Sequence, residues 1–395
     1  MKIIYVASTC SREKFSQYVE SKGSRVSQQA QKYNLLLAEG LTACGADVHV
    51  LSTRPINRIL SKKLWFKREK ESCNGVNFLY LPFLNHSLTR KLFLFCGTFF
   101  RLLFSRKKRK ETIVICDALN IAATAGALFA CKLRGYRTVG IVTDVPGHLS
   151  YSSYVSFNQK LNLFLMQKFK SYLLLTAPMS DIVNPKGRPY IVLEGHADTA
   201  MKAVPNTLNG KSEKHICLYA GSLMRIYGIE NLVNGFIAAN IPNAELHVYG
   251  DGNFAEELKQ LALRHETVKY MGVAPNAEIV EAELRATLLV NPRPTHEEYT
   301  KYSFPSKNME YMASGTAVLT TRLPGMPKDH EPYVFFIEDE TAEGIKAALE
   351  KIFALPEEEL HAFGLRAKEF ILKEKNNKAQ AAKVLTFVEE AFGIK

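Results

Sequence analysis

Short apolar runs alternate with amphipathic stretches through the first half of the chain. Strand-like runs, rich in β-branched and aromatic residues, occupy 2–7, 48–51, 76–80, 113–116, 138–142 and 172–176. Apolar residues recur at helical spacing over 29–44, 84–104, 121–134 and 157–170. Residues 8–28 and 54–71 show neither pattern and are expected to be irregular. Strands that alternate with helices of this length predict a parallel, doubly wound α/β sheet.

The second half repeats this alternation. A strand and turn over 190–198 are followed by a polar linker over 199–215. Strands are then predicted over 217–220, 246–249, 268–271, 287–290 and 317–321, and helices over 229–239, 254–264, 277–284, 305–314, 341–354, 357–372 and 377–391. We therefore expect one Rossmann-like domain over 1–205, a second over 206–375, and a helix over 376–395 that packs back on the first domain.

The stretch over 291–321 carries the strongest chemical signal. It is a strand, a loop, a helix that starts after Pro305 and stops at Gly315, and a further strand. Open α/β sheets bind ligands where loops leave the carboxyl ends of their strands, and a helix start attracts phosphate. Ser306 and Lys307 lie in the first turn, and Glu310 lies one turn further on the same side. This arrangement offers a cation to a diphosphate and a carboxylate to sugar hydroxyls. As an alternative, the two charges form a surface ion pair.

A second phosphate candidate follows the strand at 217–220. Gly221 and Ser222 allow backbone N–H groups to approach a ligand, and Arg225 offers a guanidinium that binds phosphate in a bidentate manner. Gly250 belongs to a Gly-x-Gly turn after the strand at 246–249. The alternative for both segments is an ordinary turn.

The segment FPSKNMEYMASGTAV, residues 304–318, resembles the donor-site signature of family 4 glycosyltransferases, of the bacterial polysaccharide-building type. The resemblance implies a GT-B fold, with two Rossmann-like domains facing a central cleft, and a retaining reaction with the donor in the C-terminal domain. It implies that Glu310 holds the ribose. The first of the two family glutamates falls on Tyr302, and the family's Arg and Lys of the glycine loop fall on Ser222 and Tyr227. Arg225 is expected to supply the missing charge.

The catalytic candidates are Asp144, His148 and Lys307. Asp144 and His148 follow the strand at 138–142, and the family often has a His near this point, close to the reacting sugar. Either side chain can orient or deprotonate an acceptor hydroxyl. A turn cap and a solvated histidine are the alternative roles. Lys307, Arg225 and the helix start would stabilise the departing diphosphate. No DxD carboxylate pair is visible, so we expect no metal and no cofactor.

Charge divides the chain unequally. The whole chain carries +12, residues 1–205 carry 30 basic and 12 acidic groups, or +18, and the remainder carries 51 − 30 = 21 and 39 − 12 = 27, or −6. No nucleic-acid-binding signature accompanies the basic half, which favours an anionic membrane as its partner and argues against nucleic acid. The apolar run at 92–100 and the basic block at 106–110 support membrane contact, although 92–100 also fits a buried helix.

These features predict a cytoplasmic enzyme that is peripheral on the inner face of the membrane. Seven scattered cysteines indicate reduced thiols, and the chain begins directly with a strand instead of a signal segment. We expect a glycosyltransferase that moves a sugar from a nucleotide diphosphate donor to a glycan or lipid-linked acceptor in surface polysaccharide synthesis. Two alternatives remain: a non-catalytic, glycosyltransferase-like partner subunit, and a sugar-nucleotide epimerase on the same fold.

Overall fold

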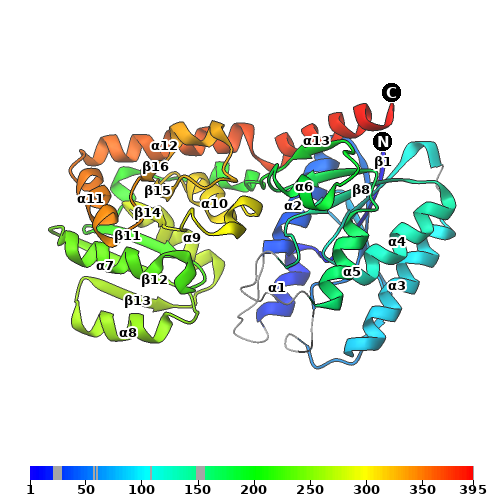
Figure 1. Cartoon of the computed structure of the whole chain (residues 1–395), viewed down its shortest axis with the longest axis horizontal. Helices are drawn as coiled ribbons and strands as arrows, with labels where there is room; N and C mark the ends of the chain where they lie inside the picture. Colours follow the sequence, from blue (N-terminus) through cyan, green and yellow to red (C-terminus); the bar gives the residue numbers. More distant parts are fainter. Residues whose placement is uncertain (21–28, 57, 59–60, 107–108, 148–155, 395) are drawn as a thin grey trace. The chain divides into compact units, whose positions relative to one another are not determined.

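The computed structural model describes residues 1–20, 29–56, 58, 61–106, 109–147 and 156–394 (Figure 1). The chain forms two compact units. Unit 1 consists of Met1–His196 together with Asn377–Lys395, and unit 2 consists of Ala197–Asn376. The sequence predicts the boundary between the two domains after Pro205, whereas in the structure the chain leaves unit 1 after His196. Each unit contains its own sheet and its own core.

Unit 1 is built on an eight-stranded sheet with the order β10-β9-β8-β7-β1-β2-β5-β4. Its strands are β1 (Lys2–Ala7), β2 (Asp47–Ser52), β4 (Glu69–Cys73), β5 (Val76–Tyr80), β7 (Thr112–Asp117), β8 (Arg137–Val142), β9 (Ser171–Leu174) and β10 (Tyr190–Val192). All neighbours pair in parallel except β4, which runs antiparallel to β5 at the edge. A separate two-stranded ribbon joins β3 (Trp65–Phe66) to β6 (Phe83–Leu84).

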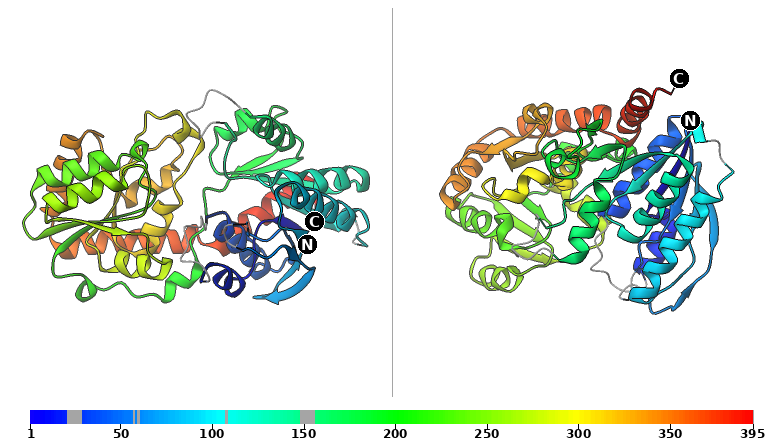
Figure 2. Two further views of the ribbon diagram at one scale, coloured as in Figure 1. Left: turned by 90° about the horizontal axis from the view of Figure 1, so that it is seen from below. Right: turned by 45° about the vertical axis from the view of Figure 1, so that its right-hand side comes forward.

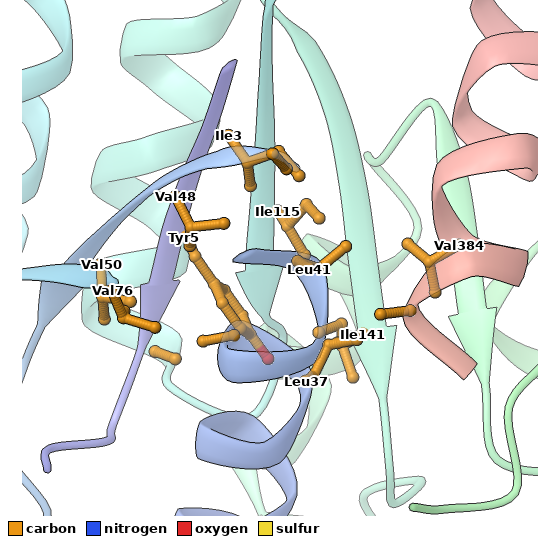
Figure 3. Packing of buried hydrophobic residues seen from close by; sticks show 14 of the residues in the cluster. Ile3, Tyr5, Leu37, Leu41, Val48, Val50, Val76, Ile115, Ile141 and Val384 are labelled. Carbon is orange, nitrogen blue, oxygen red and sulfur yellow. The ribbon is translucent and has the colours of Figure 1, made fainter. Parts of the chain in front are cut away.

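Helices cover both faces of this sheet. They are α1 (Arg12–Glu20), α2 (Gln29–Ala43), α3 (Ser87–Leu103), α4 (Ile121–Arg134), α5 (Phe157–Met166), α6 (Met179–Val183) and α13 (Asn377–Phe392). Figure 3 shows part of the core on one face, to which the strands contribute Tyr5 and Val50, α2 contributes Leu37 and α13 contributes Val384. Helices α3 and α4 lie side by side (Figure 2).

Helix α13 joins unit 1 through close backbone contact with α2. A Cβ atom on Gly40 of α2 would lie 2.1 Å from the carbonyl oxygen of Asn377, so only glycine allows the two helices to approach this closely. The Asn377 side chain also donates a hydrogen bond to the Leu36 carbonyl over 3.3 Å. The last helix of the chain therefore completes the core that the first helices begin.

Unit 2 contains a fully parallel six-stranded sheet with the order β13-β12-β11-β14-β15-β16. Its strands are β11 (His215–Ala220), β12 (Ala244–Tyr249), β13 (Val268–Gly272), β14 (Leu288–Asn291), β15 (Ala317–Thr321) and β16 (Phe335–Ile337). In this order the chain reverses direction across the sheet between β11 and β14. Doubly wound sheets bind their ligands at such a switch point.

The helices of unit 2 are divided between the two faces of its sheet. They are α7 (Ile229–Ala239), α8 (Ala255–Arg264), α9 (Asn276–Arg285), α10 (Ser306–Ser314), α11 (Ala342–Phe353) and α12 (Glu357–Glu374). The apolar faces of α7, α8 and α11 form a core with inward residues of the strands, such as Tyr219 and Val248. Helix α10 packs against α9, α12, β14 and β15. Two sheets with helices of this kind confirm the predicted α/β class with two Rossmann-like units.

Local predictions failed in two places. Residues 12–20, within the segment expected to be irregular, form α1, and the segment at 54–71 contains β3 and the start of β4. Strand β4 was missed because charged side chains dominate its sequence EKESC, as is common for an edge strand.

Helix α3 is amphipathic, with Leu94, Thr98 and Leu102 buried and the opposite side exposed. None of the helices in the described part of the chain combines the length and the apolarity needed to cross a bilayer.

Candidate active site

The switch point of unit 2 opens because β11 and β14 separate. Their pairing includes Cys217 with Leu288 and Leu218 with Leu289 and does not reach the end of β11. Beyond it, the backbone N–H of Ala220 donates to the hydroxyl of Tyr311 over 2.8 Å, and that hydroxyl donates to the Ala220 carbonyl at 3.3 Å. Burial raises the pKa of Tyr311 well above its usual value, so the phenol stays protonated. Helix α10 is thereby fastened to the end of β11.

Gly221 lies directly under the side chain of Lys307. A Cβ atom at position 221 would be 2.8 Å from Cε of Lys307 and 2.5 Å from the hydroxyl oxygen of Tyr219. The Gly221 N–H donates to the Tyr249 carbonyl at 2.9 Å, and the Tyr219 hydroxyl donates to the carbonyl of Ser222 at 2.9 Å. The absence of a side chain at Gly221 therefore leaves room for Lys307 to extend across the loop. The structure thus brings together three of the donor-site candidates, Gly221, Ser222 and Lys307.

Gly250 supports this loop from the neighbouring strand. Its φ of 133° lies in the region that favours glycine, and a Cβ atom there would lie 1.7 Å from the Gly221 carbonyl oxygen. The N–H of Leu223 also donates to the Asp251 carbonyl at 2.9 Å. The contacts of Gly250 thus hold the glycine loop in place.

Helix α10 presents the remaining predicted groups. It begins at Ser306 after Pro305 and ends at Gly315, whose φ is 85°. Lys307 and Glu310 are half-buried and lie one turn apart along the same side. The first turn also lies at the positive end of the helix dipole, which favours a negatively charged group there. Tyr302, at the position of the absent family glutamate, ends the short 3-10 helix Glu298–Tyr302.

Arg225 is engaged by neighbouring acids. Its guanidinium forms ion pairs with Glu230 and Glu257 and lies over the ring of Phe254, with Cζ 5.0 Å from the ring centroid. Two carboxylates already compensate its charge, which leaves less of it for a diphosphate.

Arg293 is a further cation near the switch point, and no pattern in the sequence singles it out. It follows β14, and its guanidinium lies over the ring of Tyr227 with Cζ 4.5 Å from the centroid. Its Nη1 donates to Ser303 Oγ over 3.2 Å. The position of Arg293 two residues after a strand of the switch point was the available signal.

The acceptor-side candidates belong to unit 1. Asp144 is half-buried in the loop after β8, two residues beyond Val142. His148 lies outside the described residues. A surface hollow of about 510 Å³ is also present in unit 1, lined in part by Ile4, Leu51 and Leu79 of the sheet and by the end of α3. The loop that contains Asp144 does not line this hollow.

The match to a known protein family falls within unit 2. Residues 202–370 match the family model described as "Glycosyl transferases group 1", which includes every site element of unit 2 described above. No curated protein sequence matches the chain significantly.

Solved structures resemble the chain over its whole length. Sucrose-phosphate synthase from Thermosynechococcus elongatus has a TM-score of 0.69 at 15% identity, with 100% of each chain covered. Anabaena HepE in complex with UDP has a TM-score of 0.64 at 13% identity, covering 99% of this chain and 100% of that one. The lipopolysaccharide outer core galactosyltransferase WaaB, in its apo form, has a TM-score of 0.59 at 13% identity, covering 99% of each. These similarities establish the GT-B type of fold.

Proposed function

Since the chain belongs to the group 1 glycosyl transferases, we propose that it transfers a sugar from UDP-sugar to a glycan or lipid-linked acceptor, with retention of the anomeric configuration. The single observation that carries this proposal is the arrangement of Lys307 across Gly221 at the start of α10, at the switch point of unit 2. HepE, a structural relative, has been solved with UDP, which makes uridine the base to test first.

The chemistry requires a stabilised leaving group. When the bond between the anomeric carbon and the phosphate oxygen breaks, negative charge accumulates on the diphosphate. Lys307, the backbone at Gly221 and Ser222, and the first turn of α10 at Ser306 meet that charge without a metal ion. Glu310 accepts hydrogen bonds from the ribose hydroxyls. Because these groups are held by the buried Tyr311 hydroxyl and by Gly250, little rearrangement is needed on binding.

The acceptor half of the reaction belongs to unit 1. The acceptor hydroxyl forms the new bond to the anomeric carbon and loses its proton. Asp144 and His148, both in the segment after β8, are the proposed groups that orient this hydroxyl or receive the proton. Asp144→Asn should therefore reduce transfer more strongly than donor binding, because the donor contacts lie in unit 2.

A donor screen tests the proposal and separates it from its alternatives. Nucleoside diphosphate sugars are added to the purified chain, and stabilisation is measured as a shift in melting temperature. UDP-sugars should stabilise the parent, and Lys307→Ala should remove most of the shift. Release of UDP identifies an enzyme, whereas binding without release favours a partner subunit. A donor converted to its epimer without release of UDP would contradict transferase activity. Absence of a shift with every donor would contradict the proposed function.

Unit 1 provides a surface for a membrane-held acceptor. Phe100 on α3 and Phe104 directly after this helix are 51% and 73% exposed, and Phe129 and Leu133 on α4 are 57% and 68% exposed. Phe95 connects the two helices through edge contact with Phe129 at a centroid distance of 6.1 Å. We call the exposed members of this group, Phe100, Phe104, Phe129 and Leu133, the aromatic patch. Exposed apolar clusters of this kind mark interaction surfaces.

Charge around the aromatic patch favours an anionic leaflet. Helices α3 and α4 contain no Asp or Glu. Lys91, Arg101 and Lys132 are exposed on them, and Arg106 follows α3. Aromatic side chains enter the interface between headgroups and acyl chains, and each neighbouring cation contributes about 1 kcal/mol of attraction to an anionic surface. The proposed location is accordingly peripheral, on the cytoplasmic leaflet.

Vesicle sedimentation tests this surface. The parent should sediment with vesicles of phosphatidylglycerol and phosphatidylcholine at low salt, and less with phosphatidylcholine alone. Replacing Phe100, Phe104 and Phe129 by Ser should reduce binding, and changing the basic block at 106–110 to Gln should make the remaining binding less sensitive to salt. The exposed Leu263→Ser change in unit 2 serves as the control. A parent that stays in the supernatant at low salt would contradict membrane attachment.

A further inference from the structure

We propose that Arg293 is the second cation of the donor site, and that it replaces the family lysine whose position is occupied here by Tyr227. The inference rests on the proposed function, because it assigns a residue to the diphosphate of the same donor. It also transfers to Arg293 the role that the sequence had suggested for Arg225.

The location of Arg293 follows from contact between two loops. Arg293 lies two residues after Asn291, the last residue of β14. Gly228, with a φ of 76°, lies so close to the Pro292 carbonyl oxygen that a Cβ atom on it would be 2.1 Å away. The loop that ends in Tyr227 and Gly228 is thus pressed against the loop that carries Arg293. The pairing of Arg293 with Tyr227 is fixed by backbone packing.

Two tyrosine rings hold the guanidinium. Its Cζ lies 4.5 Å from the ring centroid of Tyr227 and 5.7 Å from that of Tyr299, and the two rings are 6.2 Å apart. A cation over an aromatic face is attracted by the negative charge of the ring face. A positive charge is therefore present near the family's lysine position, because the Tyr227 ring at that position supports the guanidinium of Arg293 from the neighbouring loop.

The same guanidinium is close to the glycine loop. Burial raises the pKa of Tyr219, and the positive charge of Arg293 opposes that rise, which places the two groups within electrostatic reach. The hydroxyl of Tyr219 adjoins Gly221, over which Lys307 extends. Arg293, on the β14 loop, and Lys307, on α10, thus both lie against the loop that follows β11, Arg293 at Tyr227 and Lys307 at Gly221.

The electrostatic environment separates Arg293 from Arg225. Within the described part of the chain, no carboxylate lies within ion-pair distance of Arg293, and its one direct side-chain hydrogen bond goes to the neutral Ser303. Its buried Nε has no partner there either. Arg225, in contrast, is paired with two glutamates. A guanidinium without a counter-ion binds phosphate oxygens more strongly than one already neutralised.

Calorimetric titration with UDP and uridine tests this assignment. Arg293→Gln should weaken UDP binding about 10- to 100-fold, the loss of a charge-assisted hydrogen bond, and should change uridine binding less than about twofold. Arg225→Gln, the matched control, should leave both within about twofold. Arg293→Lys retains the charge but loses the flat bidentate geometry, so it should weaken UDP binding by an intermediate factor and serves if the Gln variant does not fold.

A rescue variant distinguishes binding from structural support. In the double variant Tyr227→Lys with Arg293→Gln, a lysine returns to the family position, and UDP affinity should recover relative to Arg293→Gln alone. Equal weakening of UDP and uridine would mean that Arg293 only supports the loop, and unchanged UDP affinity in Arg293→Gln would overturn the inference while leaving the proposed function intact. Loss of UDP binding in Arg225→Gln alone would return the role to Arg225. A parent that binds no UDP would overturn the UDP donor and this inference together.

Discussion

Replacing Tyr311 by Phe should destabilise unit 2 and loosen the donor site at the same time. The Tyr311 hydroxyl is fully buried, accepts from the Ala220 N–H at 2.8 Å and donates to the Ala220 carbonyl at 3.3 Å. Phe preserves the ring and its packing but leaves a buried N–H without a partner. Leaving such a group unsatisfied costs about 1–3 kcal/mol.

The size of this effect can be measured by thermal and urea unfolding. For a unit of this size, 1 kcal/mol lowers the melting temperature by about 2–4 °C, so a fall of about 2–12 °C is expected. Tyr270→Phe is the matched control, because its hydroxyl donates to the Gly250 carbonyl at 3.1 Å from a half-buried position, and it should cost about 0.5–1.5 kcal/mol. UDP affinity should also fall in Tyr311→Phe, since Ala220 precedes Gly221. Equal stability of Tyr311→Phe and the parent would refute this reasoning.

Three further predictions concern other parts of the chain. Glu310→Gln should weaken binding of uridine and UDP alike by about 1.5–3 kcal/mol, measured by calorimetry, because both carry the ribose; an unchanged Kd would remove Glu310 from the site. Gly250→Ala should destabilise the protein by more than about 1 kcal/mol, because the new Cβ atom would clash with the Gly221 carbonyl oxygen. Gly272→Ala is the control and should cost less, because Gly272 also has a positive φ, of 70°, but no atom within 4 Å of the added Cβ. Equal midpoints of urea unfolding for the two variants would contradict this prediction. Alkylation of the native protein at pH 8, read by mass spectrometry, should spare four buried cysteines, because burial raises their pKa and keeps them as thiols. They are Cys10 and Cys131, each with a pKa of about 12, and Cys116 and Cys217. Rapid labelling of these four would contradict their burial in the core.

The alternation of elements was predictable because buried parallel strands are continuous apolar runs. The strands at 2–7 and 317–321 and the helix at 229–239 were predicted with the bounds that the structure has. Edge strands were not predicted, because a strand such as β4, with both faces partly exposed, contains no continuous apolar run. Helix α1 lies in a segment with few apolar positions, and Phe15 is its buried anchor.

The sequence points to the glycines and to α10 of the proposed donor site but not to Arg293, the proposed second cation. Lys307 and Glu310 are placed by helical spacing, which a sequence displays directly. The Arg225 guanidinium is held by an ion pair with Glu257, a residue that is distant in the sequence but adjacent in the fold. Arg293 likewise meets Tyr227 only because two loops pack together at Gly228. Tertiary contacts of this kind leave no periodic signal in the chain.

The most direct test of the account is hydrogen–deuterium exchange with and without UDP, read by mass spectrometry. The account predicts slower exchange at 221–228 and 292–310, which are the two loops and the start of α10 that form the proposed donor site of unit 2. Amides of the unit 1 strands, such as β1 and β7, should exchange at unchanged rates. Protection confined to unit 1, or UDP binding without protection in either predicted segment, would contradict the location of the donor site.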